Sequence, residues 1–160
     1  MATYTILNTV LSSLDKKHLV GGIFCDLQKV FDCVNHNILL TKLEFYGISG
    51  IANQLMRPYL NHRYQRVVMK DNRTIKLTCE WEPVKHGVLQ GSILGPLLFL
   101  VYINDLSRTI NGVADSILFA DDTSIVISNI NLEEFQRNIN LVMNQTINWF
   151  QSNFFVTELQ

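Results

Sequence analysis

The chain has 160 residues, of which 48% are hydrophobic and 17% are charged. This composition excludes an intrinsically disordered segment, which combines low hydrophobicity with high net charge. Thirteen Lys and Arg residues against fourteen Asp and Glu residues give a net charge of −1, so the chain as a whole lacks the basic surface expected of a self-sufficient nucleic-acid-binding protein.

Hydrophobic periodicity divides the chain into alternating helical and strand-like segments. Leu7, Leu11 and Leu14 recur at helical spacing near the N-terminus, whereas the nearly continuous apolar run that ends on Asp26 is typical of a buried strand. In chain order we expect a helix at 3–14, a strand at 19–25, helices at 36–46 and 51–60, a hairpin of strands at 63–70 and 74–80, a loop at 82–95, a helix at 96–106, strands at 114–120 and 123–128, and a helix at 131–151.

Single residues mark several of the expected boundaries. Asn35 is a suitable N-cap for the helix that follows it, and Gly47 is a suitable C-cap. Pro58 weakens the helix expected around it, because proline removes a helical hydrogen bond, whereas Pro96 suits the first position of a helix. Helices interleaved with mostly antiparallel hairpins predict an α+β domain, in which helices pack on one face of an antiparallel sheet.

The three cysteines, Cys25, Cys33 and Cys79, match no familiar zinc or disulfide pattern. Cys25 and Cys79 lie in apolar, strand-like runs, where we expect them to pack as small hydrophobic side chains in the reduced state. The N-terminus lacks the features of a signal peptide, and the longest apolar run, at 96–103, is far shorter than the roughly 20 residues of a membrane helix. The sequence therefore predicts a soluble intracellular protein with no membrane partner, and it carries no signal that separates nucleus from cytoplasm.

Three carboxylates stand at the ends of apolar segments. Asp26 follows the first buried strand, and Asp121 and Asp122 occupy the tip of a hydrophobic hairpin. Each also fits a structural role, as a cap or as a turn residue. Carboxylates brought into one cleft repel by about 4 kcal/mol at 4 Å and an effective dielectric near 20, and a divalent cation relieves that repulsion. Oxygen-only ligands select Mg²⁺ or Mn²⁺, and such ion pairs serve polymerases and nucleases, so the acids alone leave polymerase, nuclease and structural turn open.

Three longer motifs narrow this choice. They are FCDLQKVFDCVNH at residues 24–36, HGVLQGSILGPLLF at 86–99 and FADD at 119–122. In this order and with these separations they resemble the catalytic motifs of reverse transcriptases of non-LTR (LINE-type) retrotransposons, especially the jockey-like elements of insects. The resemblance continues through the flanking segments to about residue 153.

The resemblance implies a polymerase palm and a metal-dependent reaction. Asp26 and Asp121 would ligate two Mg²⁺ ions, for which Mn²⁺ is an alternative, and Asp122 would lie beside them as an auxiliary acid. The main-chain carbonyl of Leu27 would be a further ligand. The implied function is RNA-directed DNA polymerase, in which one ion lowers the pKa of a primer 3′-hydroxyl and the other stabilises the departing pyrophosphate.

The resemblance also implies how the chain binds its substrates, an RNA template, a DNA primer and dNTPs. Phe31 would lie beneath the sugar of the incoming nucleotide and exclude a 2′-hydroxyl. Gln90 would contact the nucleotide and the template backbone, and Gly91 would permit close approach of the backbone. Contact with phosphates is an alternative for Lys29 and Arg63, but we expect each to be an ordinary solvated charge.

The sequence departs from the family pattern at a few positions and in its extent. Leu89 stands where members of the family usually carry proline, which leaves the loop backbone less restricted. Val30, Lys85 and His86 also replace the usual residues. The fingers and the thumb of the family are largely absent, so we expect residues 1–160 to form a single, partial reverse transcriptase domain that corresponds to the palm.

Three functional interpretations follow. The leading one is the palm of a reverse transcriptase, which the intact set of Asp26, Asp121 and Asp122 favours. The alternative is a catalytically inactive, truncated remnant that acts at most as a nucleic-acid or protein binding module, which the missing fingers favour. An independent Mg²⁺-dependent nuclease would need more acids than these three.

Overall fold

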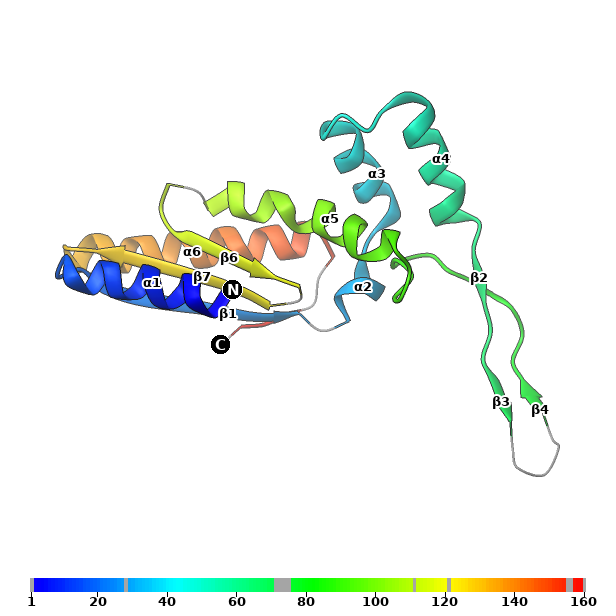
Figure 1. Ribbon diagram of the computed structural model, residues 1–160, viewed down its shortest axis with the longest axis horizontal. Helices are drawn as coiled ribbons and strands as arrows, with labels where there is room; N and C mark the ends of the chain where they lie inside the picture. The colour runs from blue at the N-terminus through cyan, green and yellow to red at the C-terminus, as the bar shows by residue number, and fades with distance from the viewer. Residues whose placement is uncertain are drawn as a thin grey trace.

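The computed structural model describes residues 2–27, 29–70, 76–110, 112–120, 122–154 and 157–159. Its elements are α1 (Ala2–Asp15), β1 (Leu19–Leu27), α2 (Val30–Cys33), α3 (His36–Phe45), α4 (Gly50–Asn61), β2 (Tyr64–Gln65), β3 (Val68–Lys70), β4 (Lys76–Thr78), β5 (Glu82–Pro83), α5 (Leu94–Ile110), β6 (Asp115–Phe119), β7 (Asp122–Asn129), α6 (Leu132–Ser152) and β8 (Thr157–Leu159). Figure 1 shows a layered body made by the two ends of the chain, from which the middle part of the chain projects.

The body is built around a four-stranded sheet with the strand order β6-β7-β1-β8. β1 pairs with β7 and β8, and β7 pairs with β6, all in antiparallel orientation. Alternate residues of β1, namely Ile23, Cys25 and Leu27, are buried in one hydrophobic core together with residues of α5 and α6. The predicted α+β class, with helices packed on a face of an antiparallel sheet, is confirmed.

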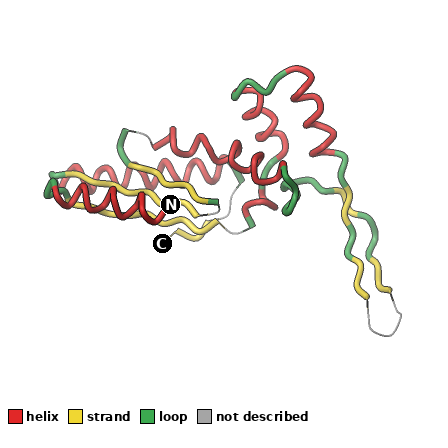
Figure 2. Tube along the Cα trace, viewed as in Figure 1, coloured by secondary structure: helices red, strands yellow, loops and turns green. Residues whose placement is uncertain are grey.

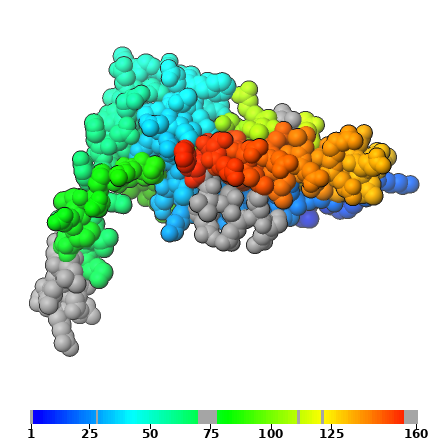
Figure 3. Space-filling view, turned by 180° about the vertical axis from the view of Figure 1, so that it is seen from behind, coloured from blue at the N-terminus to red at the C-terminus, as the bar shows by residue number. Residues whose placement is uncertain are grey.

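The opposite face of the sheet carries α1, which contacts β1, β6 and β7. Figures 1 and 3 place α1 and α6 on opposite sides of the sheet. The spacing of Leu7, Leu11 and Leu14 predicted this helix correctly, but these three side chains are exposed. Ser13 is buried and Ile6 is half-buried instead, so α1 meets the sheet through a different stripe of its surface.

The ends of α3 follow the predicted signals. The Asn35 side-chain oxygen accepts hydrogen bonds from the backbone N–H groups of Asn37 and Ile38, at 3.0 and 3.2 Å. Gly47 adopts a φ of 89° just after the last turn, and its N–H donates to the Glu44 carbonyl at 3.0 Å. Both caps depend on neighbouring residues only, which is why the sequence predicts them.

Two prolines lie inside helices rather than at their ends. α4 runs through Pro58, because a proline in the last turn removes only one hydrogen bond and Leu60 is fully buried just beyond it. α5 begins at Leu94, two residues before Pro96, and the first turn of a helix tolerates proline because its N–H groups have no helical partner. Within the described residues no helix, α5 included, is both long and apolar enough to cross a membrane.

The segment between α4 and α5 forms a long two-stranded projection (Figure 2). The expected hairpin is confirmed by the pairing of β3 with β4, and β2 pairs with β5 nearer the body, inside a segment predicted to be loop. The turn expected at 71–73 lies outside the described residues. The predicted burial of Cys79 is wrong: this cysteine is exposed, because no helix or second sheet of the described part of the chain covers the projection.

Two more short elements, in addition to β5, have no counterpart in the predictions. α2 has four residues and follows β1, and β8 has three residues and pairs with the outer edge of β1. Neither is long enough to produce a hydrophobic period. α2 matters for function, because it carries Phe31.

Candidate active site

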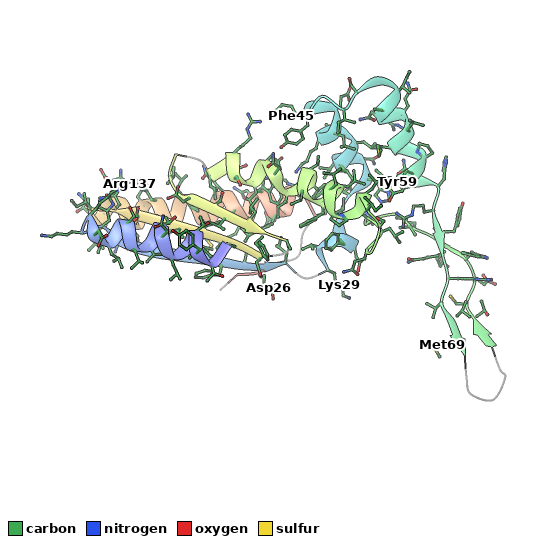
Figure 4. The ribbon with its side chains drawn as sticks, viewed as in Figure 1. Asp26, Lys29, Phe45, Tyr59, Met69 and Arg137 are labelled. Atoms are coloured by element: carbon green, nitrogen blue, oxygen red, sulfur yellow. The ribbon has the colours of Figure 1, made fainter. Side chains whose placement is uncertain are left out.

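Two of the predicted acids meet at the end of the sheet. The register of β1 and β7 places Asp26 directly opposite Asp122, and both are exposed. Side chains opposite each other in an antiparallel pair lie on the same face, with Cβ atoms about 4.5–5.5 Å apart. Asp121, the third predicted acid, lies outside the described residues. Figure 4 shows Asp26 at the end of the sheet that leads to α2, with Lys29 on the adjoining turn.

The paired acids line a pocket of about 420 Å³ on the sheet face that α1 partly covers. Phe24 and Phe119 contribute apolar walls, and Ala2, Thr3 and Ile6 of the first turns of α1 close one side. Pockets of this size accommodate small ligands. The pocket therefore combines a polar end, made by the carboxylates, with an apolar floor.

The available donors fit a hard divalent cation better than zinc, because carboxylate and carbonyl oxygens select Mg²⁺ or Mn²⁺. Leu27 buries its side chain in the core and registers with Thr157 of β8, so only its main chain is available at that position. Burial raises the pKa of the neighbouring Cys25 thiol to about 11, and a protonated thiol is a poor metal ligand. Among the described residues, no three His, Cys, Asp or Glu side chains lie close enough together to hold a metal ion by themselves.

A second, smaller pocket of about 120 Å³ lies on the other side of the strand end. Leu27, Phe31 and Gln90 all line it. The Phe31 ring packs against Phe99 of α5, with 5.0 Å between ring centroids. The fold therefore brings together Phe31 and Gln90, two of the residues assigned to nucleotide binding by the resemblance.

The loop that carries Gln90 is held against α2 by main-chain contacts. The Gly87 N–H donates to the Val34 carbonyl at 2.8 Å, and the Val88 N–H donates to the Phe31 carbonyl at 2.7 Å. Gly87 has a φ of 90°, and a Cβ there would lie 2.9 Å from the Phe31 carbonyl oxygen. Glycine is therefore required at position 87 for two reasons: it adopts the positive φ without strain, and it has no Cβ to clash with the Phe31 carbonyl oxygen.

His36 makes a structural contact with the second motif that the sequence reasoning missed. Its ring is buried, and Nε2 lies 2.8 Å from the Gly87 carbonyl oxygen, so Nε2 carries the proton and donates. The contact joins residues 51 positions apart in the chain. The only signal in the sequence is that His36 closes the first motif and His86 opens the second.

The rest of the loop has open space around it. Gly91 has a φ of 83°, and no described atom lies within 4 Å of the place where a Cβ would be. Leu89, in place of the usual proline, is exposed, and its carbonyl accepts a hydrogen bond from the Ser92 hydroxyl at 2.8 Å. The Ser92 oxygen also accepts from the Gly95 N–H at 2.9 Å, so this serine fixes the loop where a proline is absent.

Behind the site, a polar cluster ties three helices together. Lys42 of α3 forms an ion pair with Asp105 of α5 at 2.7 Å, and Asp105 also accepts from the Trp149 indole N–H of α6 at 3.2 Å. Burial lowers the pKa of Lys42, although Asp105 acts in the opposite direction. Tyr102 accepts from the backbone N–H of Asn35 at 3.3 Å, and burial raises the pKa of its phenol to about 12. This cluster fixes α3, and with it the first motif, on α5, the helix that begins inside the second motif.

The family model described as "Reverse transcriptase (RNA-dependent DNA polymerase)" matches residues 5–154. This chain belongs to the reverse transcriptase family. Members of this family use divalent metal ions, which agrees with the oxygen donors at the end of the sheet.

Curated relatives of this reverse transcriptase domain come from LINE-type retrotransposons of insects. The RNA-directed DNA polymerase from mobile element jockey of Drosophila funebris is 29% identical over 130 residues, which cover 77% of this chain and 13% of the relative. The probable RNA-directed DNA polymerase from transposon BS of Drosophila melanogaster is 31% identical over 103 residues, which cover 61% of this chain and 10% of the relative. The chain therefore spans only a small part of the length of these relatives.

Solved telomerase structures share the fold of this reverse transcriptase domain. Apo telomerase from Candida tropicalis, truncated from its C-terminal domain, matches with a TM-score of 0.63 and 13% identity, over 99% of this chain and 35% of that chain. Telomerase from the same organism, in complex with a TWJ fragment of telomeric RNA, matches with a TM-score of 0.66 and 12% identity, over 99% of this chain and 29% of that chain. The match over nearly the whole chain confirms the palm-like α+β fold.

Proposed function

We propose that this chain is the palm of an RNA-directed DNA polymerase and that Asp26, Asp121 and Asp122 hold two Mg²⁺ ions, or Mn²⁺ in their place. The observation that carries the proposal is the register of β1 and β7, which sets Asp26 opposite Asp122 on one face of the sheet. Two carboxylates at this spacing repel each other unless a cation lies between them. The main-chain carbonyl of Leu27 is a further ligand in this proposal.

The residues of the chain then divide into two groups. Asp26 and Asp122 are exposed and free of ion pairs with described Lys or Arg residues, so their oxygens are available to a cation. When bound, two such ions lower the pKa of an attacking hydroxyl and stabilise a departing pyrophosphate. The apolar side chains of Phe24 and Phe119 line the same pocket.

The second group positions the nucleotide. Phe31 and Gln90 share one pocket, and Phe31 is backed by Phe99, so its ring is held in one place. A rigid ring beneath a sugar rejects a 2′-hydroxyl by shape, and the Gln90 amide can donate and accept hydrogen bonds at the base or sugar. The open space beside Gly91 leaves room for a template backbone. The proposed substrates are dNTPs, a DNA primer and an RNA template, and the telomerase relative in complex with RNA supports the assignment of RNA.

Metal titration tests the proposed site directly. We expect Mn²⁺ to bind the chain weakly, and Asp26→Asn and Asp122→Asn each to reduce the affinity about tenfold or more, because each removes one charged ligand. Electron paramagnetic resonance of free Mn²⁺ measures this affinity. Asp115→Asn is the matched control, since Asp115 is exposed on β6, the strand on the other side of β7, at the end away from Asp122. Titration curves that are identical in all four proteins would contradict the proposal.

A further inference from the structure

The projection between α4 and α5, here called the arm, consists of residues 62–70 and 76–86. Figures 1 and 3 show it extending away from the body. Two strand pairs hold its legs together, and between them the Val67 N–H donates to the Cys79 sulfur at 2.9 Å while the Cys79 N–H donates to the Val67 carbonyl at 3.1 Å. The arm is therefore an ordered element that leaves both of its faces to solvent.

One face of the arm presents aromatic rings beside a cation. The β2–β5 register pairs Tyr64 with Pro83. The same register, continued two residues further along each leg, sets Arg66 opposite Trp81. The Arg66 guanidinium lies 4.5 Å from the centroid of the Trp81 ring, which confirms that they share a face. Trp81 is 57% exposed, whereas the other tryptophan, Trp149, is 7% exposed. An exposed indole that is already stacked with a guanidinium is a surface suited to a further planar group.

Charge is separated between the arm and the rest of the chain. The two legs carry five Lys and Arg residues and two Glu residues, which gives +3. The remaining sequence has eight Lys and Arg residues and twelve acids, which gives −4. The near-neutral total therefore conceals a cationic projection on an anionic body, and a cationic projection attracts phosphate.

A polar pocket of about 520 Å³ continues from the base of the arm to the loop of the second motif. Arg63, Gln65 and His86 line it from the arm, and Lys29 and Gln90 line it from the site. The sequence favoured a solvated charge for Arg63, but its Nη1 is buried and has no hydrogen-bond partner among the described residues. Arg63 is half-buried and its guanidinium lies 5.7 Å from the centroid of the Tyr59 ring, and the Nη1 group that lacks a hydrogen-bond partner is well placed to donate to an anionic oxygen.

We propose that the arm is a platform for single-stranded RNA. Unpaired bases stack on Trp81 and Tyr64, Arg66 and Lys85 contact phosphates, and the strand continues past Arg63 toward Gln90. The proposal rests on the proposed polymerase function, since it says where the template lies. Single-stranded RNA is favoured over duplex RNA, because the major groove of A-form RNA is too narrow to admit a β-ribbon and paired bases do not offer their faces to an indole.

The test measures binding of a 12-residue oligouridine to the full chain in EDTA and without nucleotides. We expect saturable quenching of the exposed Trp81, while the buried Trp149 is not accessible to the bases. By anisotropy of labelled oligouridine, we expect Trp81→Ala and Arg66→Glu each to weaken binding about tenfold and Trp81→Phe to retain most of it. Arg66→Gln lowers the slope of log affinity against log salt by about 0.7, the value for one phosphate contact.

Arg137→Glu is the matched control, because Arg137 is exposed on α6 at the end of the body away from the arm (Figure 4). It changes the net charge as Arg66→Glu does, and we expect it to change the affinity less than twofold. Equal losses in both variants, or unchanged binding in Trp81→Ala, overturn the proposal. Tighter binding of duplex DNA than of oligouridine also overturns it. So does a chain that binds no RNA but self-associates through the arm, with the arm variants abolishing that self-association. The RNA-binding assay contains EDTA and therefore holds no metal, so a failure of the metal site is detected by the Mn²⁺ titration alone.

Discussion

Phe31 lies at the contact between the two halves of the candidate site. One edge of its ring packs against Phe99, and the ring lines the pocket that Gln90 shares. Its position on the four-residue α2, immediately after β1, depends on long-range packing that no local pattern encodes. The motif spacing therefore predicted that Phe31 is near the site, but only the fold shows that Phe99 supports its ring.

In a polymerase that contains this palm, Phe31→Ala removes the ring proposed to lie beneath the sugar. We expect the preference for dNTPs over rNTPs, measured as the ratio of kcat/KM values, to fall about tenfold or more, because a pocket that has lost its wall no longer rejects one added hydroxyl. Phe45→Ala is the control, since Phe45 is exposed on α3 away from this pocket. An unchanged ratio in Phe31→Ala contradicts the assignment.

Cys25 couples the stability of the sheet to alkaline pH. Burial raises the pKa of its thiol from 9.0 to about 11, so the folded chain retains a proton that the unfolded chain releases. The stabilisation is complete below pH 9 and is lost as the pH rises through 11, which amounts to about 3 kcal/mol of unfolding free energy. The raised pKa of Tyr102, about 12, extends the decline to higher pH.

Urea unfolding at pH 8 and at pH 11 measures this loss. Cys25→Ala is less stable at pH 8 because it leaves a cavity, but we expect its free energy of unfolding to fall less between the two pH values. A decline of equal size in both proteins shows that Cys25 does not carry the effect.

Among the elements, the loop that begins at Gly87 depends most on a single glycine. We expect Gly87→Ala to lower the free energy of unfolding by about 2–3 kcal/mol, because it adds both backbone strain and a Cβ 2.9 Å from the Phe31 carbonyl oxygen. Gly47→Ala is a close control, with a φ of 89° and, apart from its chain neighbours, no described residue within 4 Å of the added Cβ. The Gly47→Ala variant adds backbone strain without a steric clash, and we expect it to lower the free energy of unfolding, measured in urea, by about 1 kcal/mol. Equal losses contradict the docking of this loop on α2.

The elements that the sequence predicted share one property, which is that their signals are local. α3 is framed by Asn35 and Gly47, and α6 has an amphipathic period and an Asn131 cap. The elements it missed, α2 and β8, are short and exist because β1 offers them a partner. Cys79 shows the converse: an alternating strand pattern predicts burial, but the arm projects into solvent and nothing covers it.

At the scale of the whole molecule, charge is divided between an anionic body and a cationic arm. The acids proposed to bind metal lie at one end of the sheet, where any nucleic acid must approach against a body of net charge −4. The net charge of −1 is correct, but it does not show that the positive charges are concentrated on the arm, because composition carries no information on where a β-ribbon places its charges.

This division predicts that the 160-residue chain alone is a poor polymerase. Affinity for primer and template depends on phosphate contacts, and eight Lys and Arg residues outside the arm are outnumbered by twelve acids. The curated relatives, of which the matched segment is 10–13%, have much more chain with which to hold the nucleic acid.

We expect the isolated chain to extend a DNA primer on an RNA template at less than about 1% of the rate of a longer protein that includes it, since a loosely held primer end loses the alignment on which the reaction depends. A gel assay of primer extension measures both rates, and Asp121→Asn in the longer protein sets the background. Robust extension by the isolated chain that Asp121→Asn abolishes would show that the palm and its arm suffice to hold primer and template.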